Sequence, residues 1–353
     1  MPLQTALARR FGLSTPIIQA PMAGGSDSPE LVGAVSAAGG LGFLGCAYFT
    51  GEAILAAGQA IRRLTDRPFG LNLFSPWPEP GNPDPAPALA ALAPWFEELG
   101  LQAPAPPPPQ PVLFDEQFAA VLESGAAAFS FTFGLPPGGA ITSAQERGMA
   151  VLGTATTVEE AILVAQAGCD AVIAQGSEAG GHRGTFAGHI EDSLIGTMAL
   201  VPQVCDAVGV PVIASGGVMD GRGLAAALML GAQAVQMGTV FLTSDEAGAS
   251  APYRQAVLAA HENQTALTRA FSGRQARGVV NRVMRETPEA SILPFPLQNA
   301  LTRPMRTEAA RQGREEFLSL WAGQGLRMAR TAKAADLVAQ ITAQAEALLG
   351  GAA

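Results

Sequence analysis

Residues 171–184 read AVIAQGSEAGGHRG. The unbroken apolar run Ala171–Ala174 is typical of a strand buried on both faces of a parallel sheet. After Gln175, four glycines within nine residues surround a single histidine, His182, and glycine lets a loop approach a flat ligand closely. An imidazole has an unperturbed pKa of about 6.5, so it can gain or lose a proton near neutral pH. The stretch therefore predicts a barrel strand that opens into an active-site loop; a glycine-rich surface turn with an incidental histidine is the alternative.

Short apolar runs of the same kind recur along the chain and alternate with helical patterns. Ser28 before Pro29 has the pattern of a helix start, and Thr157 with Glu160 has the spacing of a capping box. Because the strands alternate with helices and number eight, we expect an α/β fold, a closed (β/α)8 TIM barrel. No GxGxxG follows the first strand, which argues against a Rossmann fold. The expected strands are 16–22, 41–47, 68–74, 127–134, 150–156, 171–175, 211–217 and 234–242.

Two segments interrupt the repeating pattern. Residues 76–111 are rich in proline, including Pro106 to Pro109, and cannot pair in a sheet. We expect a lid loop over the barrel mouth there, although an inert excursion fits equally well. Residues 245–325 look helical and rich in arginine, without strand runs. The chain is thus expected to hold a barrel over 1–244, an inserted helical substrate-binding domain over 245–325, and a final barrel helix within 326–353.

Composition and charge limit the ligands. The chain has 21 Lys and Arg against 30 Asp and Glu, a formal net charge of -9, and no basic block, so nucleic acid and anionic lipid are not expected partners. Its three cysteines lie in apolar runs and are expected to be buried thiols in a reducing compartment. Residues 1–16 lack the apolar region of a signal peptide, and no span is long enough for a bilayer. We therefore expect a cytoplasmic protein.

Two residue types are too rare for several kinds of catalysis. Lys333 is the only lysine and lies in a helical pattern far from the glycine motifs, so Schiff-base chemistry lacks a nucleophile. The three histidines, His182, His189 and His261, form no His-x-His or HExxH pair, so we expect no metal site. An enzyme of this composition would depend on an organic cofactor.

Small and uncharged polar residues follow the expected strands at the end where barrel enzymes bind ligands. Ser215-Gly216-Gly217 and Gly238-Thr239 follow the last two strands, and each precedes a helix, so their backbone N–H groups could hold a phosphate. Tight turns required only by barrel geometry are the alternative. Pro21-Met22-Ala23, Asn72 and Gln175 suit the amide edge of a heteroaromatic ring. A ring together with a phosphate indicates FMN.

These stretches resemble the class I nitronate monooxygenases, formerly called 2-nitropropane dioxygenases. The glycine motifs are shared by several FMN barrels, whereas EAGGHRG together with FSGRQARG is much more specific. The resemblance runs in the same order from about residue 10 to 345. It rests on QAPMAGG (19–25), GLNLF (70–74), GSEAGGHRG (176–184), IASGGV (213–218), GAQAVQMGTVFL (231–242) and ENQTALTRAFSGRQARGVVNR (262–282).

The resemblance implies an FMN site and one catalytic residue. His182 would be catalytic, as a base toward a neutral nitroalkane or as a donating partner of an anionic nitronate. Asn72 and Gln175 would hold the flavin ring or its ribityl chain. The other cofactor contacts would come from Ala20, Pro21, Met22, Ala23, Gly180, Gly181, Ser215, Gly216, Gly217, Gln236, Met237, Gly238 and Thr239.

The implied reaction is the FMN-dependent oxidation of alkyl nitronates, for example propionate 3-nitronate, and of nitroalkanes with O2 to carbonyl compounds and nitrite, by a monomer or a homodimer. One alternative is an FMN-dependent NAD(P)H oxidoreductase of the enoyl-reductase or quinone-reductase type, which shares the barrel and a similar glycine-histidine loop. Another is an inactive flavin-carrying barrel whose insert binds a partner.

Other polar residues carry weaker expectations. We expect Arg183 to be solvated, with a rim charge that attracts an anionic substrate as the alternative. Tyr253 is a candidate to line the cavity from the insert, with a position away from the cavity as the equal alternative. His189 and His261 are expected to be surface or structural residues. Four arginines are expected to tie the insert down rather than to bind nucleic acid: Arg269, Arg274, Arg277 and Arg282.

Overall fold

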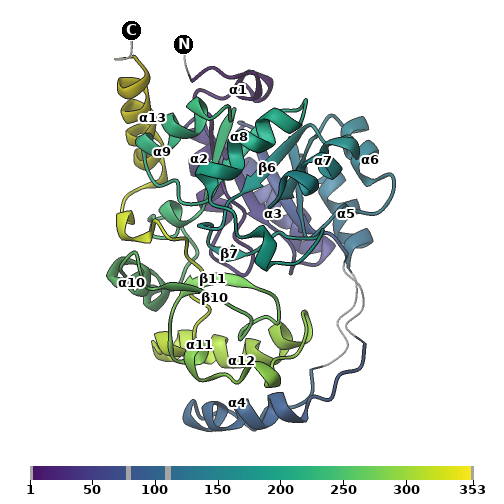
Figure 1. Ribbon diagram of the computed structural model, residues 1–353, viewed down its shortest axis with the longest axis vertical. Coiled ribbons are helices and arrows are strands. Elements are labelled where there is room, and N and C mark those ends of the chain that lie inside the picture. The colour runs from purple at the N-terminus through teal and green to yellow at the C-terminus, as the bar shows by residue number, and fades with distance from the viewer. Residues whose placement is uncertain (1–2, 77–80, 108–112, 351–353) are drawn as a thin grey trace.

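A closed barrel of eight parallel strands forms the centre of the computed structural model, which describes residues 3–76, 81–107 and 113–350 (Figure 1). The barrel closes where β1 pairs with β9, with Ile17 opposite Val235. This architecture confirms the predicted TIM barrel. In order around the barrel, the strands are β1 (Ile17–Gln19), β2 (Leu41–Gly45), β3 (Phe69–Phe74), β4 (Ala128–Thr132), β5 (Ala150–Ala155), β6 (Ala171–Gln175), β8 (Val212–Ser215) and β9 (Ala234–Met237).

Helices surround the barrel, and local capping explains where several of them start. The Ser28 hydroxyl accepts a hydrogen bond from Leu31 N at 3.0 Å, and the Asp220 carboxylate caps α9. Thr157 caps α7 as predicted. The barrel helices are α2 (Pro29–Ala37), α3 (Gly51–Leu64), α5 (Phe114–Glu123), α6 (Ala140–Glu146), α7 (Val158–Gln166), α8 (Thr197–Ala207), α9 (Gly221–Met229) and α13 (Ala334–Gly350); α1 (Ala6–Phe11) precedes the first strand.

The last helix returns to the barrel across a large sequence separation. Leu337 and Ile341 of α13 are buried in the same cluster as the outward faces of the strands. Gln344 accepts a hydrogen bond from Gly221 N at 2.8 Å at the start of α9. In Figure 1, α13 lies beside α9. The barrel thus obtains its final helix from the C-terminal segment, as expected.

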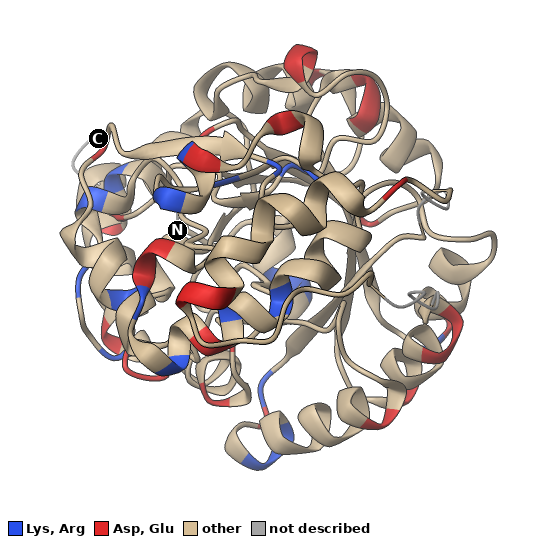
Figure 2. Ribbon diagram, turned by 90° about the horizontal axis from the view of Figure 1, so that it is seen from below, with Lys and Arg blue, Asp and Glu red and all other residues tan. Residues whose placement is uncertain are grey.

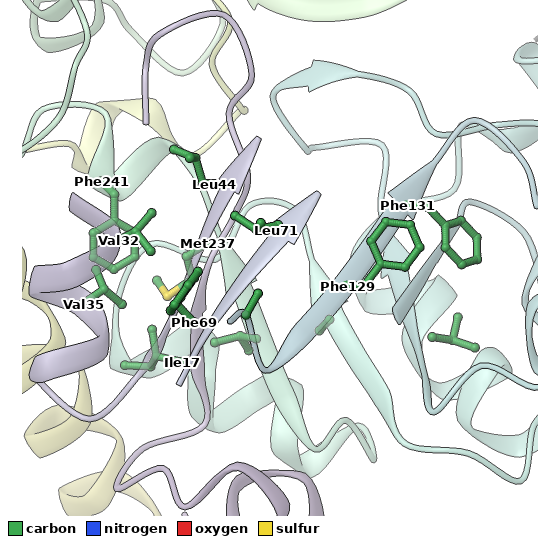
Figure 3. Close-up of a cluster of buried hydrophobic side chains, with 14 of the residues drawn as sticks. Ile17, Val32, Val35, Leu44, Phe69, Leu71, Phe129, Phe131, Met237 and Phe241 are labelled. Carbon is green, nitrogen blue, oxygen red and sulfur yellow. The ribbon is translucent and has the colours of Figure 1, made fainter. Parts of the chain in front are cut away.

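The core has two layers. Between strands and helices, Ile17, Val32, Val35 and Phe69 pack together (Figure 3). Inside the barrel, Phe43 is fully buried among aliphatic side chains. Its ring occupies the space in front of Gly70 on the neighbouring strand, because a Cβ at Gly70 would lie 2.2 Å from Phe43 Cε1. The absence of a side chain at Gly70 therefore makes room for the aromatic ring.

The segment between β9 and α13 folds into a second layer over the barrel mouth, below the barrel in Figure 1. Its helices are α10 (Ala251–Ala259), α11 (Arg282–Glu286) and α12 (Leu297–Gln312). The prediction of a purely helical insert is wrong, because β10 (Thr265–Thr268) and β11 (Ala276–Val279) pair antiparallel. Alanine, leucine and arginine favour helices locally, but β11 is fixed by pairing with β7 (Gly181–His182) from the barrel side.

The eighth barrel strand is shorter than predicted. It ends at Met237, and residues Thr239–Phe241 form a 3-10 turn instead of continuing to Leu242. Gly238 lies at this transition, so the change of backbone direction occurs at the glycine that was expected to face a ligand.

The proline-rich segment supports the insert. Its helix α4 (Ala86–Glu98) buries Leu92 and Trp95 against insert residues, with the Trp95 and Phe317 rings 6.2 Å apart. None of the described residues of 76–111 lines the central cavity. The lid therefore stays a prediction, and part of the Pro106 to Pro109 run lies outside the described residues.

Charged residues of both signs lie on the outer helices and turns in the view from below (Figure 2). Across the described ranges, no helix has the length and apolar character needed to cross a bilayer. The same ranges contain no group of three or more His, Cys, Asp or Glu side chains arranged to hold a metal ion.

Replacing Phe43 by Ala tests the packing inside the barrel. We expect the free energy of unfolding to fall by about 3–5 kcal/mol, because the change leaves a cavity that β3 cannot fill without a side chain at Gly70. Urea unfolding followed by circular dichroism measures it. An exposed apolar residue, Met229 at 78% exposure, provides the control, and a loss no larger for Phe43→Ala than for Met229→Ala would refute the account.

Candidate active site

A cavity of about 650 Å³ opens between the C-terminal ends of the barrel strands and the insert. All sixteen residues predicted for the site line it, from Ala20–Ala23 at β1 to Gln236–Thr239 at β9, together with His182. The insert contributes Tyr253 and Trp321 to the cavity wall. The structure thus brings the predicted residues together, and their individual roles stay predictions.

The end of β8 has the backbone form of an anion site. Gly216 and Gly217 have φ angles of 120° and 72°, a conformation that residues with side chains rarely adopt. A Cβ at Gly217 would also lie 3.3 Å from the Glu178 side chain. Helix α9 starts shortly afterwards, but its first N–H groups already donate to Gln344 and Asp220, so the case for an anion site rests on the glycine turn itself. These features fit a phosphate held by main-chain N–H groups.

Two amides at the cavity wall differ in how they are satisfied. Asn72 donates from Nδ2 to the Ser130 hydroxyl at 2.9 Å, which confirms that this buried amide needs a partner. The Oε1 atom of Gln236 is buried and has no hydrogen-bond donor among the described residues. Because an unpaired buried acceptor costs about 1–3 kcal/mol, this oxygen fits a ligand that presents an N–H or O–H group.

Gln175 shapes the histidine loop with both ends of its amide. Its Nε2 donates to the His182 carbonyl at 3.1 Å, and its Oε1 accepts from Gly184 N at 2.9 Å. On the other side of the loop, Arg183 N donates to the Gln275 carbonyl of the insert at 2.9 Å. The backbone around His182 is therefore held from the barrel and from the insert.

Aromatic rings enclose the His182 imidazole. Its ring centroid lies 5.6 Å from that of Trp321 and 5.8 Å from that of Phe133. Phe74 and Phe295 complete the enclosure at 6.3 and 6.1 Å. Burial, with smaller effects of the Arg274 and Arg306 charges, lowers the pKa of His182 to about 3. The imidazole is therefore neutral at physiological pH.

Known proteins resemble this chain along nearly its whole length. The model of the nitronate monooxygenase family matches residues 7–344. The chain belongs to the nitronate monooxygenase family. It is 42% identical over 354 residues to a probable nitronate monooxygenase of Staphylococcus saprophyticus, with 99% of both chains covered. It is 44% identical over 325 residues to one of Bacillus subtilis, covering 90% of this chain and 92% of that relative.

A solved structure agrees with this assignment. The nitroalkane oxidase from Streptomyces ansochromogenes superposes with a TM-score of 0.92 at 41% sequence identity, covering 99% of this chain and 100% of that one. The family resemblance inferred from the sequence motifs is thereby confirmed, and this nitronate monooxygenase family member is an oxidoreductase.

Arg183 does not lie where the sequence suggested. The expectation of a solvated or rim charge is wrong, because its side chain is 0% exposed. The guanidinium donates to the carbonyls of Gly176 at 2.6 Å, Gln175 at 3.1 Å and Ser193 at 3.0 Å. Burial lowers its pKa to about 10, so it stays charged. Arg183 therefore stabilises the loop that carries His182, and it is not a group that contacts the substrate.

Of the remaining polar expectations, those for His189, His261, Arg274 and Arg277 are confirmed. His189 and His261 are exposed. Arg274 and Arg277 tie the insert to the barrel, because they donate to the carbonyls of Thr185 and Ser177. Arg269 and Arg282 form ion pairs with Glu289 and with Glu98 and Glu286.

Sequence reasoning missed a cationic wall on α12. Asn299, Arg303 and Arg306 line the cavity at helical spacing, and Arg303 lies 5.6 Å from the ring centroid of Tyr48. Arg306 donates from Nη2 to the Asn299 side chain at 2.8 Å, while its buried Nε has no partner among the described residues. Since no aspartate or glutamate is among the described residues that line the cavity, these charges are not neutralised there. The i, i+4, i+7 spacing was the signal that could have identified them.

The low pKa of His182 predicts a pH-dependent stability. The imidazole has a pKa of about 3 in the folded protein and about 6.5 in the unfolded chain, so unfolding takes up a proton between these values. The stability that the neutral ring contributes is complete above the unfolded pKa and is lost as the pH falls toward 3. Between pH 7 and pH 5 we expect wild type to lose about 1–2 kcal/mol more than His182→Asn, measured by urea unfolding.

His261→Asn serves as the control, since His261 is exposed. Burial raises the pKa of Asp27 to about 6, but this carboxyl titrates in wild type and variant alike and cancels in the comparison. Superimposable pH profiles for wild type and His182→Asn would show that the histidine is not held neutral by the fold.

Proposed function

We propose that this protein is an FMN-dependent nitronate monooxygenase that oxidises alkyl nitronates, for example propionate 3-nitronate, and nitroalkanes with O2 to carbonyl compounds and nitrite. The observation that carries the proposal is a neutral imidazole, His182, on the wall of a cavity that also holds the uncompensated charges of Arg303 and Arg306. A solved relative that is 41% identical to this chain is a nitroalkane oxidase, which supports the same substrate class.

The residues of the cavity fit FMN. The phosphate would be held by the backbone of Ser215–Gly217 and Gly238–Thr239. The unpaired Oε1 of Gln236 would accept from the flavin or its ribityl chain, and Asn72 and Gln175 would lie at the ring edge. When bound, FMN supplies the redox chemistry, since it accepts electrons from the substrate and delivers them to O2.

The side chains of this chain account for the proton and the charge. A neutral nitroalkane must lose the proton on the carbon that bears the nitro group, and the unprotonated His182 imidazole can accept it. The resulting imidazolium is then paired with the nitronate anion, which offsets the cost of charging a buried ring. A nitronate that arrives as an anion needs no proton transfer. It is drawn in by Arg303 and Arg306, while the aromatic rings exclude water around the histidine.

Anaerobic titration of the purified holoprotein tests the proposed function. Without O2, we expect propionate 3-nitronate to bleach the visible flavin band within the mixing time of a stopped-flow instrument. In a separate aerobic assay, we expect an oxygen electrode to record O2 uptake, with nitrite as product. Rapid bleaching by NADH or NADPH and none by nitronate would instead favour the NAD(P)H oxidoreductase alternative. A colourless protein that does not take up FMN would remove the basis of the proposal.

Replacing His182 by Asn separates proton transfer from anion binding. Because asparagine cannot act as a base, we expect kcat/KM for nitroethane to fall by about 10²–10⁴-fold, and kcat/KM for ethyl nitronate to fall much less. His261→Asn is the matched control. Full activity of His182→Asn on both substrates would exclude the catalytic role.

A further inference from the structure

The tight turn between β10 and β11 carries a buried hydroxyl group to the edge of the catalytic imidazole. Ser272 is 1% exposed and belongs to the insert. The turn around it requires a glycine, because Gly273 has a φ of 84° and a Cβ there would lie 2.3 Å from the Leu293 carbonyl oxygen. The Ser272 hydroxyl oxygen lies 2.8 Å from Nε2 of His182. The FSGRQARG motif thus contains a direct partner of the histidine.

The hydrogen bonds of Ser272 determine which atom carries the proton in this contact. Its hydroxyl donates to the Arg274 carbonyl at 3.0 Å, and its oxygen accepts from Arg274 N at 3.3 Å. A serine hydroxyl has one proton and two acceptor sites. A hydroxyl proton directed to Arg274 O leaves the remaining acceptor site facing His182, and this arrangement requires the His182 tautomer with its proton on Nε2.

The surroundings keep the imidazole in this orientation. His182 is paired with Ala276 of β11, on the far side of the same turn. Four aromatic rings surround the imidazole. Ser272 lies outside the set of residues that line the cavity, so Nε2 is engaged with the insert rather than with the ligand space. Within the described part of the chain, no hydrogen bond to Nδ1 is found.

We propose that Ser272 is a positioning residue that holds His182 in the tautomer with its proton on Nε2, so that Nδ1 is the ring nitrogen that accepts the substrate proton. The proposal rests on the proposed function for the proton transfer, but the tautomer itself is a property of the protein alone. The insert thereby takes part in the chemistry, because the Ser272 hydroxyl of the insert sets which ring nitrogen of His182, on the barrel side, carries the proton.

Nitrogen-15 NMR of histidine-labelled holoenzyme tests the tautomer directly. The chain has only three histidines, and the signals of His182 are those that disappear in His182→Asn. In wild type we expect a protonated Nε2 and an unprotonated Nδ1. Ser272→Ala should give a mixture of both tautomers or the opposite one, whereas Ser272→Thr, which keeps the hydroxyl, should retain the wild-type pattern. A wild-type ring protonated on Nδ1, or a pattern unchanged in Ser272→Ala, overturns the proposal.

A kinetic comparison provides the second readout. With nitroethane, which must lose a proton, we expect Ser272→Ala to lower kcat about 10–100-fold; with ethyl nitronate, which needs no proton transfer, the change should stay within about threefold. Thr302→Val is the matched control, because the Thr302 hydroxyl donates to the Phe271 carbonyl of the same turn at 2.6 Å without contacting His182. This control should retain both the tautomer and the ratio of the two activities.

The outcomes separate this proposal from the proposed function. Equal losses on the two substrates, or the same change of ratio in Thr302→Val, would mean that Ser272 only stabilises the turn, and the positioning role would be rejected. A wild-type enzyme inactive on both substrates would reject the proposed function, while the NMR result would still decide the tautomer. If Ser272→Ala does not fold, the wild-type and Ser272→Thr spectra decide it.

Discussion

The pairing of β7 with β11 is the contact on which the geometry of the candidate site depends. On the barrel side it involves only Gly181 and His182, opposite Arg277 and Ala276 of the insert. Gly181 has a φ of 74°, so the loop can turn into this short strand without a steric penalty. The barrel supplies the loop and the insert supplies the partner strand. Neither the barrel nor the insert alone fixes the orientation of the His182 imidazole. The geometry of the site therefore depends on a strand pairing between residues nearly a hundred positions apart in the sequence.

The buried charges of Glu160 and Arg183 stabilise the loop that carries His182. The Glu160 carboxylate accepts from the Thr156 hydroxyl at 2.6 Å and from Ala187 N at 2.8 Å. It also accepts from Thr156 N at 2.6 Å, so it reaches the residue before the cap rather than closing a capping box with Thr157. The Arg183 guanidinium donates to three carbonyl groups from its two Nη atoms, while its buried Nε has no partner among the described residues. Burying a charge is costly unless hydrogen bonds compensate it, so these bonds allow the loop few other conformations.

The features that were predictable from the sequence are those specified locally. Short apolar runs predicted the eight barrel strands, and Ser28 and Thr157 predicted helix starts, because each signal depends on neighbours within a few residues. The strands of the insert were not predictable in this way. Thr265–Thr268 and Ala276–Val279 have no apolar alternation. They pair with each other, and Ala276–Val279 also pairs with Gly181–His182, which lies far away in the chain.

The same distinction applies to the site. The glycine and amide positions were found because they follow strands, and strand ends meet at one edge of a barrel. Ser272 and Arg306 were not identified as site residues, because their relation to His182 appears only when the insert has folded over the barrel mouth. Arg183 was misplaced for a related reason. A loop arginine looks solvated unless the carbonyl groups that surround it are known, and one of them comes from Ser193.

The whole chain has a negative net charge, whereas the charged side chains that line its cavity are positive. This difference affects which charged ligands can bind. A net charge of -9 disfavours polyanions over the outer surface. At physiological ionic strength, however, that charge is screened beyond about 8 Å, so a small anion inside the cavity responds mainly to the nearest groups. Those groups are Arg303 and Arg306, without an acidic side chain among the described lining residues. A neutral His182 is consistent with this environment, because burial and then the charges of Arg274 and Arg306 disfavour its protonated form and lower its pKa. The cavity can therefore be selective for small anions although the protein as a whole is acidic.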